Sequence, residues 1–340
     1  MSATMKDIAQ KSGLSLGTVS KYFNGGSLRP QNRAQIEAAV QALDYTPNLT
    51  ARNLKTKQTK TVGVMLPELG SAFMSDIVAH IEDTLRRSDY GIIVCDYRCD
   101  ETLECDIVSF LLHKQVDGIF SVPMRADGTQ FAPALKKNVP VVLIDRLLKP
   151  LDGLVSAVVI NNQIISRHAI CALLNAGHRR IGLLAGKRSL STTIDRLQGY
   201  KDAFCERGIP LDPELIAYGD YTMSGGFLAA EQLLALPDQP TALFCTNYEM
   251  TLGARIALNK AGLSVPHDVS LIGFDDMDMT KAIFPDTTLV VQPMRALSDH
   301  AAEQMLSLLS ARETQHKVIT LPATLKFGET IAPPTHNPAR

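Results

Sequence analysis

The 340-residue chain lacks an apolar run approaching the ~20 residues that a membrane helix requires. Its first residues, M-S-A-T-M-K-D-I-A-Q-K, lack the apolar core of a signal peptide. Its six cysteines are dispersed, without the paired C-x-x-C spacing that is typical of structural zinc sites. We therefore expect a cytoplasmic protein with reduced thiols, no membrane segment, no metal and no cofactor.

Motifs of common enzymes are also missing. The chain has no P-loop, and no glycine-rich dinucleotide turn follows its first β-branched run at residues 62–66. Gly13, Ser15 and Gly17 do match the G-x-S-x-G pattern of hydrolases, but that pattern needs a strand before the serine. Residues 4–11 read as a helix instead, so we expect no enzyme. A sugar-binding transport component is the other alternative, and it would need a signal peptide and no DNA-binding head.

Charge is distributed unevenly along the chain. Residues 1–60 contain nine Lys or Arg against three acids, a net charge of +6, which leaves −7 for residues 61–340. A basic segment ahead of an acidic body indicates a polyanionic partner at the N-terminal end. A solvated lysine-rich surface is the alternative that charge alone leaves open.

The first 45 residues have the pattern of three helices. Thr4 can cap the first helix together with Asp7, and Gly13 can end it in the left-handed conformation. Ser15 can cap a second helix that buries Val19 and Phe23. A third helix starts at Pro30 and turns three apolar side chains inward, those of Ile36, Val40 and Leu43. Helix, glycine turn and helix predict a helix-turn-helix, whose second helix enters the major groove of DNA.

The rotation of the second helix selects the DNA-contacting side chains. With Val19 and Phe23 inward, the outer face can reach base edges and phosphates. We predict that this face consists of Leu16, Gly17, Thr18, Ser20, Lys21 and Asn24.

From residue 61 onward, short β-branched runs alternate with amphipathic stretches. We expect strands at residues 62–66, 92–95, 118–122, 139–144, 157–160, 181–185, 242–245 and 270–273. We expect helices between them, at 74–88, 101–114, 163–176, 226–235 and 249–262. This alternation predicts an α/β core of two parallel-sheet lobes, with a ligand at the carboxyl ends of the strands.

These motifs resemble those of the lactose repressor/galactose repressor (LacI–GalR) family along nearly the whole chain. The matching stretches are M-K-D-I-A-Q-K-S-G-L-S-L-G-T-V-S-K-Y-F-N (5–24), D-Y-T-P-N-L-T-A-R-N-L (44–54), V-P-V-V-L-I-D-R (139–146) and V-P-H-D-V-S-L-I-G-F-D (265–275). The resemblance implies a periplasmic-binding-protein-like core and a hinge helix in which Ala51 and Leu54 contact DNA. Leu54 would insert into the minor groove at the centre of a palindromic operator. Arg29 departs from the serine or threonine usual in the family, which leaves either a weaker helix start or an extra phosphate contact.

Polar side chains follow several of the predicted strands. Asp145, Asn247 and Asp275 each stand after a buried run, and Arg196 is expected to open a helix after the strand at 181–185. Carboxylate, amide and guanidinium groups in one crevice suit a polyhydroxylated ligand. Together with positions matched through the resemblance, the predicted effector site comprises Phe73, Asp145, Asn161, Arg196, Tyr221, Asn247, Asp275 and Gln292.

Several positions in this site have a second interpretation. Asp145 can cap a turn, and Phe73 and Tyr221 can be core aromatics. Lys187 and Arg188 either favour a phosphorylated sugar or are solvated surface charges. By the resemblance, uncharged Leu190 stands where a purine-binding relative has arginine, which argues against a purine. His178, in a turn, is expected to be structural.

Taken together, these features predict a homodimeric, effector-controlled transcriptional repressor. Residues 1–46 form its DNA-binding head, 47–60 its hinge and 61–340 its core. The N-lobe takes in about 61–160 and 292–321, and the C-lobe about 162–290 and 323–340, with crossovers near 161, 291 and 322. The C-terminal residues lack the leucine heptads that a coiled-coil tetramer would need.

Overall fold

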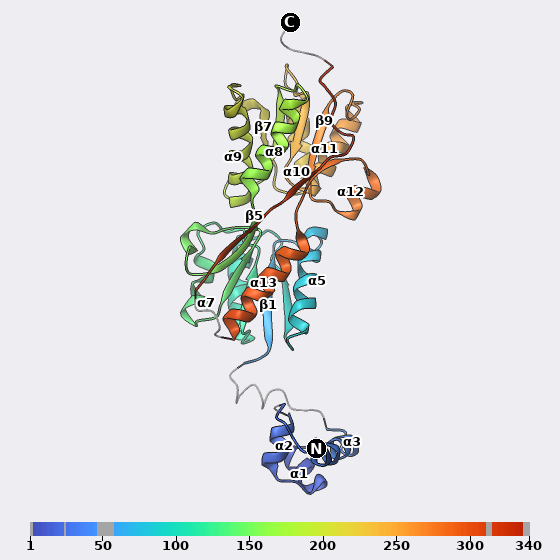
Figure 1. Cartoon of the computed structure of the whole chain (residues 1–340). Helices are drawn as coiled ribbons and strands as arrows, with labels where there is room; N and C mark the ends of the chain where they lie inside the picture. The colour runs from blue at the N-terminus through green and yellow to red at the C-terminus, as the bar shows by residue number, and fades with distance from the viewer. Residues whose placement is uncertain (1–2, 24, 46–57, 311–314, 336–340) are drawn as a thin grey trace. The chain divides into compact units, whose positions relative to one another are not determined.

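A computed structural model of the chain describes residues 3–23, 25–45, 58–310 and 315–335 (Figure 1). Contacts within the chain divide it into two compact units, Met1–Thr59 and Lys60–Arg340. The first unit is the head, and the second is the core. No helix among the described residues is long and apolar enough to cross a membrane.

The head contains α1 (Met5–Ser12), α2 (Leu16–Phe23) and α3 (Pro30–Ala42). The predicted capping box of α1 is present, because the amide of Thr4 donates to Asp7 Oδ2 at 2.8 Å and the amide of Asp7 donates to Thr4 Oγ1. Gly13 ends this helix at φ 69°, in the left-handed region. The capping role of Ser15 is confirmed as well, since its Oγ accepts from the amide of Thr18 at 3.2 Å.

Apolar side chains from all three helices form the core of the head. Ile8, Val19 and Ile36 are fully buried, and Ala39 and Tyr45 complete the cluster. Helix α3 begins directly after Arg29, whose side chain makes no capping hydrogen bond. The departure at residue 29 therefore leaves this helix without a side-chain cap.

The first lobe of the core is built on a six-stranded sheet of order β11-β5-β4-β3-β1-β2 in which every pairing is parallel. Its strands are β1 (Thr61–Leu66), β2 (Gly91–Asp96), β3 (Gly118–Ser121), β4 (Val141–Ile144), β5 (Ser156–Ile160) and β11 (Val318–Leu321). Its helices are α5 (Ala72–Arg86), α6 (Glu101–His113), α7 (Ala132–Lys136) and α13 (Met294–Leu309), with short 3-10 turns at Thr129–Phe131 and Lys149–Leu151. Successive strand residues face opposite layers: Val64 packs with α5 and α13, whereas Met65 packs with α6.

The second lobe has a six-stranded sheet of order β12-β10-β9-β8-β6-β7, parallel except for the β10–β12 pair. Its strands are β6 (Ile181–Ala185), β7 (Ile216–Tyr218), β8 (Ala242–Cys245), β9 (Ser270–Phe274), β10 (Thr288–Val291) and β12 (Thr324–Lys326). Its helices are α8 (Asn162–Asn175), α9 (Ser191–Glu206), α10 (Met223–Leu234), α11 (Tyr248–Lys260) and α12 (Asp278–Ile283), with a 3-10 turn at Pro213–Leu215. The predicted fold of a helical head and two parallel-sheet lobes is confirmed.

The chain passes between the two sheets three times. It leaves the first sheet after β5, returns after β10 to form α13 and β11, and crosses again to form β12 (Figure 1). The eight predicted strands all exist, but β7, β10, β11 and β12 were not predicted. These four strands are three or four residues long, and each includes at least one residue that is not buried, whereas the equally short β4 is a run of buried residues.

Candidate functional site

The outer edge of α2 is the first candidate site. Val19 is fully buried, whereas Leu16 is 45% exposed and Gly17 and Lys21 are also exposed. The predicted rotation of the helix therefore agrees with the structure at these positions. Thr18 and Ser20 are half-buried, and the hydroxyl of Thr18 lies 2.9 Å from that of Ser15 at the helix start. Asn24, Ala51 and Leu54 lie outside the described residues.

Helix α2 is held to α3 by its aromatic side. The Tyr22 hydroxyl donates to Glu37 at 3.3 Å, and the Arg33 guanidinium lies 5.6 Å from the centroid of the Tyr22 ring. The neighbouring ring of Phe23 packs against Tyr22 and Tyr45. These contacts fix which edge of α2 is left for a partner.

A cavity lies in the core and takes side chains from both lobes. Its apolar wall comes from Pro67, Phe73, Met74 and Met124, and its polar wall from the ends of several strands and the starts of helices. Seven of the eight predicted effector-site residues line it, namely Phe73, Asp145, Arg196, Tyr221, Asn247, Asp275 and Gln292.

Asp145 and Asp275 occupy equivalent places in the two lobes. Each follows a central strand, β4 or β9, and each has a φ of 67°, in the left-handed region that non-glycine residues rarely adopt. Their amides remain paired, that of Asp145 with the carbonyl of Val158 and that of Asp275 with the carbonyl of Val290. This backbone turn brings both carboxyl groups to the cavity, as strained residues at functional sites often do.

Arg196 is the best-fixed cation of the cavity. It lies in the second turn of α9, which begins at Ser191, so the expectation that it opens the helix is wrong by about one turn. Its Nε donates to Asn162 Oδ1 at 2.7 Å, and its Nη1 donates to the carbonyl of Thr246. Its Nη2 lies 4.0 Å from Asp145 Oδ1. Only 3% exposed, the guanidinium is held in place for a ligand in the cavity.

Asp275 and Gln292 form a buried pair. Gln292 Nε2 donates to Asp275 Oδ1 at 2.7 Å. Burial raises the pKa of Asp275 to about 6, although the positive charge of Arg196 opposes that shift. The amide of Gln292 must turn its nitrogen toward the carboxylate, so its oxygen points the other way.

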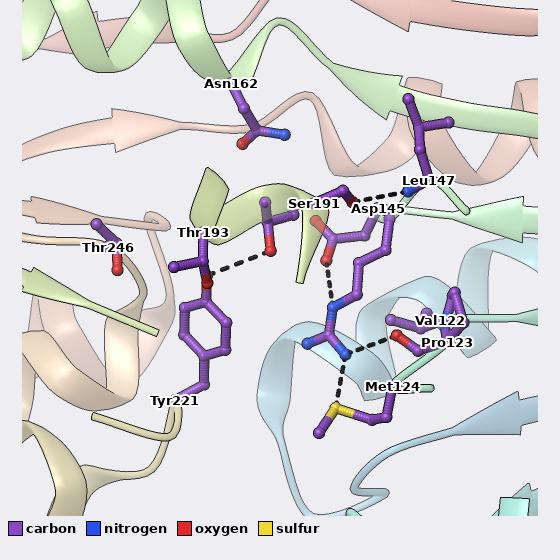
Figure 2. Close-up of polar contacts among 12 residues, drawn as sticks. Val122, Pro123, Met124, Asp145, Leu147, Asn162, Ser191, Thr193, Tyr221 and Thr246 are labelled. Carbon is purple, nitrogen blue, oxygen red and sulfur yellow. Dashed lines mark hydrogen bonds and ion pairs between the residues drawn. The ribbon is translucent and has the colours of Figure 1, made fainter. Parts of the chain in front are cut away.

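Tyr221 is positioned by its hydroxyl group and by a glycine beneath its ring. The hydroxyl lies 2.8 Å from Thr193 Oγ1 and 3.2 Å from Thr192 Oγ1, and Figure 2 shows the ring directed toward Thr193. A Cβ atom at Gly186 would lie only 2.1 Å from Tyr221 Cζ. The ring therefore sits where only glycine leaves room for it.

Two of the predicted residues differ from expectation. Asn161 does not line the cavity: its Oδ1 accepts from the amide of Ala323 at 2.9 Å, so it joins two of the segments that cross between the lobes. Its neighbour Asn162 reaches Arg196 instead. Asn247 lines the cavity, but its Oδ1 caps α11 and its Nδ2 donates to Glu249 and to the carbonyl of Tyr221. Asn247 therefore positions its neighbours.

Glu249 is a cavity residue that the sequence reasoning missed. Its Oε1 accepts from Ser71 Oγ of the first lobe at 2.9 Å, and the hydroxyl of Tyr248 accepts from the amide of Ala72 at 3.1 Å. Burial raises the pKa of Glu249 to about 7, and the nearby negative charge of Asp275 contributes to this shift. The first turn of α11 therefore touches the first lobe beside the cavity. Acidic residues are so common in the first turn of a helix that the position of Glu249 alone did not indicate this role.

Arg146 was also missed as a cavity residue. Its Nη1 donates to the carbonyl of Pro123 at 3.0 Å and lies 2.9 Å from Met124 Sδ, and its Nε lies 3.5 Å from Asp145 Oδ2 (Figure 2). The side chain is buried, and its Nε faces Asp145 Oδ2, whereas Arg196 faces Oδ1 of the same carboxylate.

Residues with two interpretations are resolved in part. His178 is buried among Thr241, Ser270 and the carbonyl of Ala332, and burial lowers its pKa, so it has the structural role that was predicted. The Arg188 guanidinium lies 3.6 Å from the centroid of the Tyr218 ring, outside the cavity lining. Among the described residues, no group of three or more His, Cys, Asp or Glu side chains could hold a metal ion.

Comparison with known proteins finds relatives of both the head and the core. Residues 4–48 match the model of bacterial regulatory proteins of the lacI family, and residues 170–331 match a periplasmic binding protein-like domain. The ribose operon repressor of Haemophilus influenzae is 30% identical over 332 residues, which cover 97% of this chain and 98% of the relative. A lac repressor dimer bound to operator and the anti-inducer ONPF has a TM-score of 0.84 at 28% identity, covering 98% of this chain and 100% of the other. The transcriptional regulator CelR in complex with cellobiose has a TM-score of 0.74 at 28% identity, covering 97% of this chain and 100% of the other.

The G-x-S-x-G match at Ser15 falls between two helices, and the Ser15 hydroxyl caps the second of them, so it is no nucleophile elbow. The basic head, the cavity between the lobes and the full-length similarity agree with one another. The chain belongs to the lacI family of bacterial regulatory proteins, which are DNA-binding transcriptional repressors and not enzymes.

Proposed function

We propose that this protein is a cytoplasmic repressor that binds a palindromic operator as a homodimer and responds to a small sugar-like effector. Residues 1–46 read the DNA, residues 47–60 form the hinge, and residues 61–340 bind the effector and the second subunit. Support for the dimer and the operator comes from the lac repressor complex, and support for a sugar comes from the cellobiose complex of CelR.

The DNA-reading surface is the outer edge of α2. An exposed Leu16 can touch a thymine methyl group, Gly17 permits close approach, and Lys21 can donate to a base edge or a phosphate. The full surface that we propose comprises Leu16, Gly17, Thr18, Ser20, Lys21 and Asn24. Each subunit would place this edge in one major-groove half-site.

The hinge adds contacts at the centre of the operator. We propose that Ala51 and Leu54 enter the minor groove there and that Leu54 opens a base step, which bends the duplex. This part of the proposal rests on the sequence motif at residues 44–54.

The effector site is the cavity between the lobes. Asp145, Arg196 and Asp275 supply buried, directional polar groups, and Phe73 and Tyr221 offer flat surfaces for the apolar face of a ring. Asn247 and Gln292 complete the site by holding Glu249 and Asp275. The cavity takes residues from both lobes, so a bound effector contacts both of them at once. It alters operator affinity only if it binds different arrangements of the lobes with different affinity.

One observation carries the proposal: α2 exposes Leu16, Gly17 and Lys21 within a head that matches the lacI-family model. The test is selection of binding sites for the full-length protein from a randomised duplex library at two salt concentrations. We expect a symmetric consensus whose affinity falls steeply with salt. Recovery of no symmetric, salt-sensitive site, with or without candidate sugars, would refute the assignment.

A further inference from the structure

We propose that the effector is a polyhydroxylated amine, which carries a positive charge, rather than a neutral or a phosphorylated sugar. This inference rests on the proposed function, because it concerns the ligand of the same cavity. Four observations support it: the charge of the lining, two acceptor atoms without partners, the use of the available donors, and the apolar wall.

The lining of the cavity is strongly acidic. Its five carboxyl groups belong to Glu68, Asp145, Asp220, Glu249 and Asp275, and its two cations are Arg146 and Arg196. Lys187 and Arg188, which suggested a phosphorylated ligand, do not belong to the lining. A phosphate group would add negative charge to this excess, whereas an ammonium group reduces it.

Among the described residues, three buried atoms of this lining have no hydrogen-bond partner. One is a donor, Arg146 Nε, and two are acceptors, Asp145 Oδ1 and Gln292 Oε1, on side chains that are only 7% and 6% exposed. The side-chain amide of Gln292 cannot be flipped to give its oxygen a partner, because the flip would place that oxygen against the carboxylate of Asp275. Buried acceptors without partners are costly, so both acceptors indicate that the ligand brings donors to this end of the cavity.

Most side-chain donors of the lining are already engaged by the protein. Ser71 donates to Glu249, Thr222 to Asp220, and Gln292 to Asp275. Arg146 donates to the carbonyl of Pro123, and Arg196 donates to Asn162 and to the carbonyl of Thr246. Since the remaining capacity lies mainly in acceptors, hydroxyl and ammonium groups fit the cavity better than a phosphate, whose oxygens accept.

Glu249 and Asp275 are the carboxyl groups that we assign to the ammonium group. Both line the cavity, where Asp275 is buried and Glu249 half-buried, and the negative charge of Asp275 opposes ionisation of Glu249. A cation between them removes that repulsion, while Phe73 and Met74 cover the carbon skeleton of the ligand. Recognition of the amine therefore uses the first turn of α11 and the end of β9.

Tris and pentaerythritol are a matched pair of probes, because they share three hydroxymethyl groups and differ in an amine against a fourth hydroxymethyl group. Thermal unfolding of the full-length protein would be measured with each compound and with inorganic phosphate, at constant pH and ionic strength. We expect Tris to bind about tenfold more tightly than pentaerythritol, as one desolvated charge pair allows, and phosphate to give no stabilisation. Glu249→Gln should reduce the ratio of the affinity for Tris to the affinity for pentaerythritol. Asp106→Asn, which changes an exposed carboxylate on α6, is the control and should leave that ratio unchanged.

Equal shifts with Tris and pentaerythritol, or a larger shift with phosphate, would overturn the preference for an amine. If phosphate stabilised the protein and Arg196→Ala removed that effect, the cavity would remain the effector site but its ligand would be anionic. If no cavity substitution altered any of these responses, the proposed effector site would fail as well.

Discussion

The guanidinium carbon of Arg196 lies 3.9 Å from the centroid of the Phe274 ring, so the cation stacks on the last residue of β9. Asp275, the next residue, turns its carboxyl group into the cavity from the same strand end. The end of β9 therefore supplies the aromatic ring that orients the Arg196 guanidinium, and it also supplies the Asp275 carboxylate, whose charge the guanidinium helps to neutralise.

Replacing Arg196 should separate effector response from DNA binding. Arg196→Ala leaves Asp145 and Asp275 without this buried cation, so we expect a loss of about 3 kcal/mol in the free energy of unfolding. Operator affinity without effector should persist, and the response to effector should disappear. Denaturant unfolding and operator titrations check both parts.

Arg167→Ala is the matched control, because its half-exposed ion pair with Glu206 should contribute no more than about 1 kcal/mol. A normal effector response in Arg196→Ala would place the ligand elsewhere.

Adding a methyl group beneath Tyr221 should damage the cavity without changing its charge. Gly186→Ala puts a Cβ atom 2.1 Å from Tyr221 Cζ, so the ring must move away from Thr193. We expect a loss of about 1–3 kcal/mol in stability together with weaker effector binding. Gly91→Ala, where a Cβ meets nothing within 4 Å, is the control. Equal stability of the two variants in thermal unfolding would show that the ring does not depend on Gly186.

Removing the exposed cation of α2 should weaken DNA binding in a salt-dependent way. Lys21→Ala should lower operator affinity and reduce the slope of log affinity against log salt by about 1 if the lysine contacts a phosphate. Relaxed sequence selectivity would assign it to a base edge instead. Lys136→Ala removes the same charge from the exposed surface of α7 in the core and should leave the slope unchanged. Identical DNA binding by Lys21→Ala and the parent protein would remove Lys21 from the recognition surface.

Stability should fall as pH rises through the range in which the cavity carboxyl groups ionise. Burial raises the pKa of Asp275 from 3.8 to about 6 and that of Glu249 from 4.5 to about 7. The folded protein therefore keeps protons that the unfolded chain has released, and each group destabilises the fold progressively between those two values. The slope is at most about 1.4 kcal/mol per pH unit for each group.

Glu249→Gln should flatten this decline between pH 4.5 and 7, as measured by denaturant unfolding across the range. Asp106→Asn, on the exposed face of α6, should leave the decline unchanged. A decline of equal slope in Glu249→Gln would show that Glu249 ionises normally in the folded protein.

Local sequence patterns predicted the features that depend on neighbouring residues. The capping box at Thr4, the turn at Gly13 and the rotation of α2 all follow from spacings within one or two helical turns. The fully buried strands were equally clear, because a run such as residues 141–144 is apolar on both faces of the sheet.

Contacts between distant segments were harder to predict. Glu249 meets Ser71 across 178 residues of sequence, and nothing near either residue indicates the other. Asn161 and Asn162 are identical in type and adjacent, yet the start of α8 directs one to Ala323 and the other to Arg196. Only the path of the backbone between the lobes distinguishes them.

The three passages between the sheets have a consequence for how the core is made. β11 closes one edge of the first sheet and β12 one edge of the second, and only two residues separate them. Neither lobe can complete its sheet during synthesis until this late segment has left the ribosome. Truncation before residue 318 would remove both β11 and β12, so each lobe would lose an edge strand of its sheet and neither lobe would remain complete.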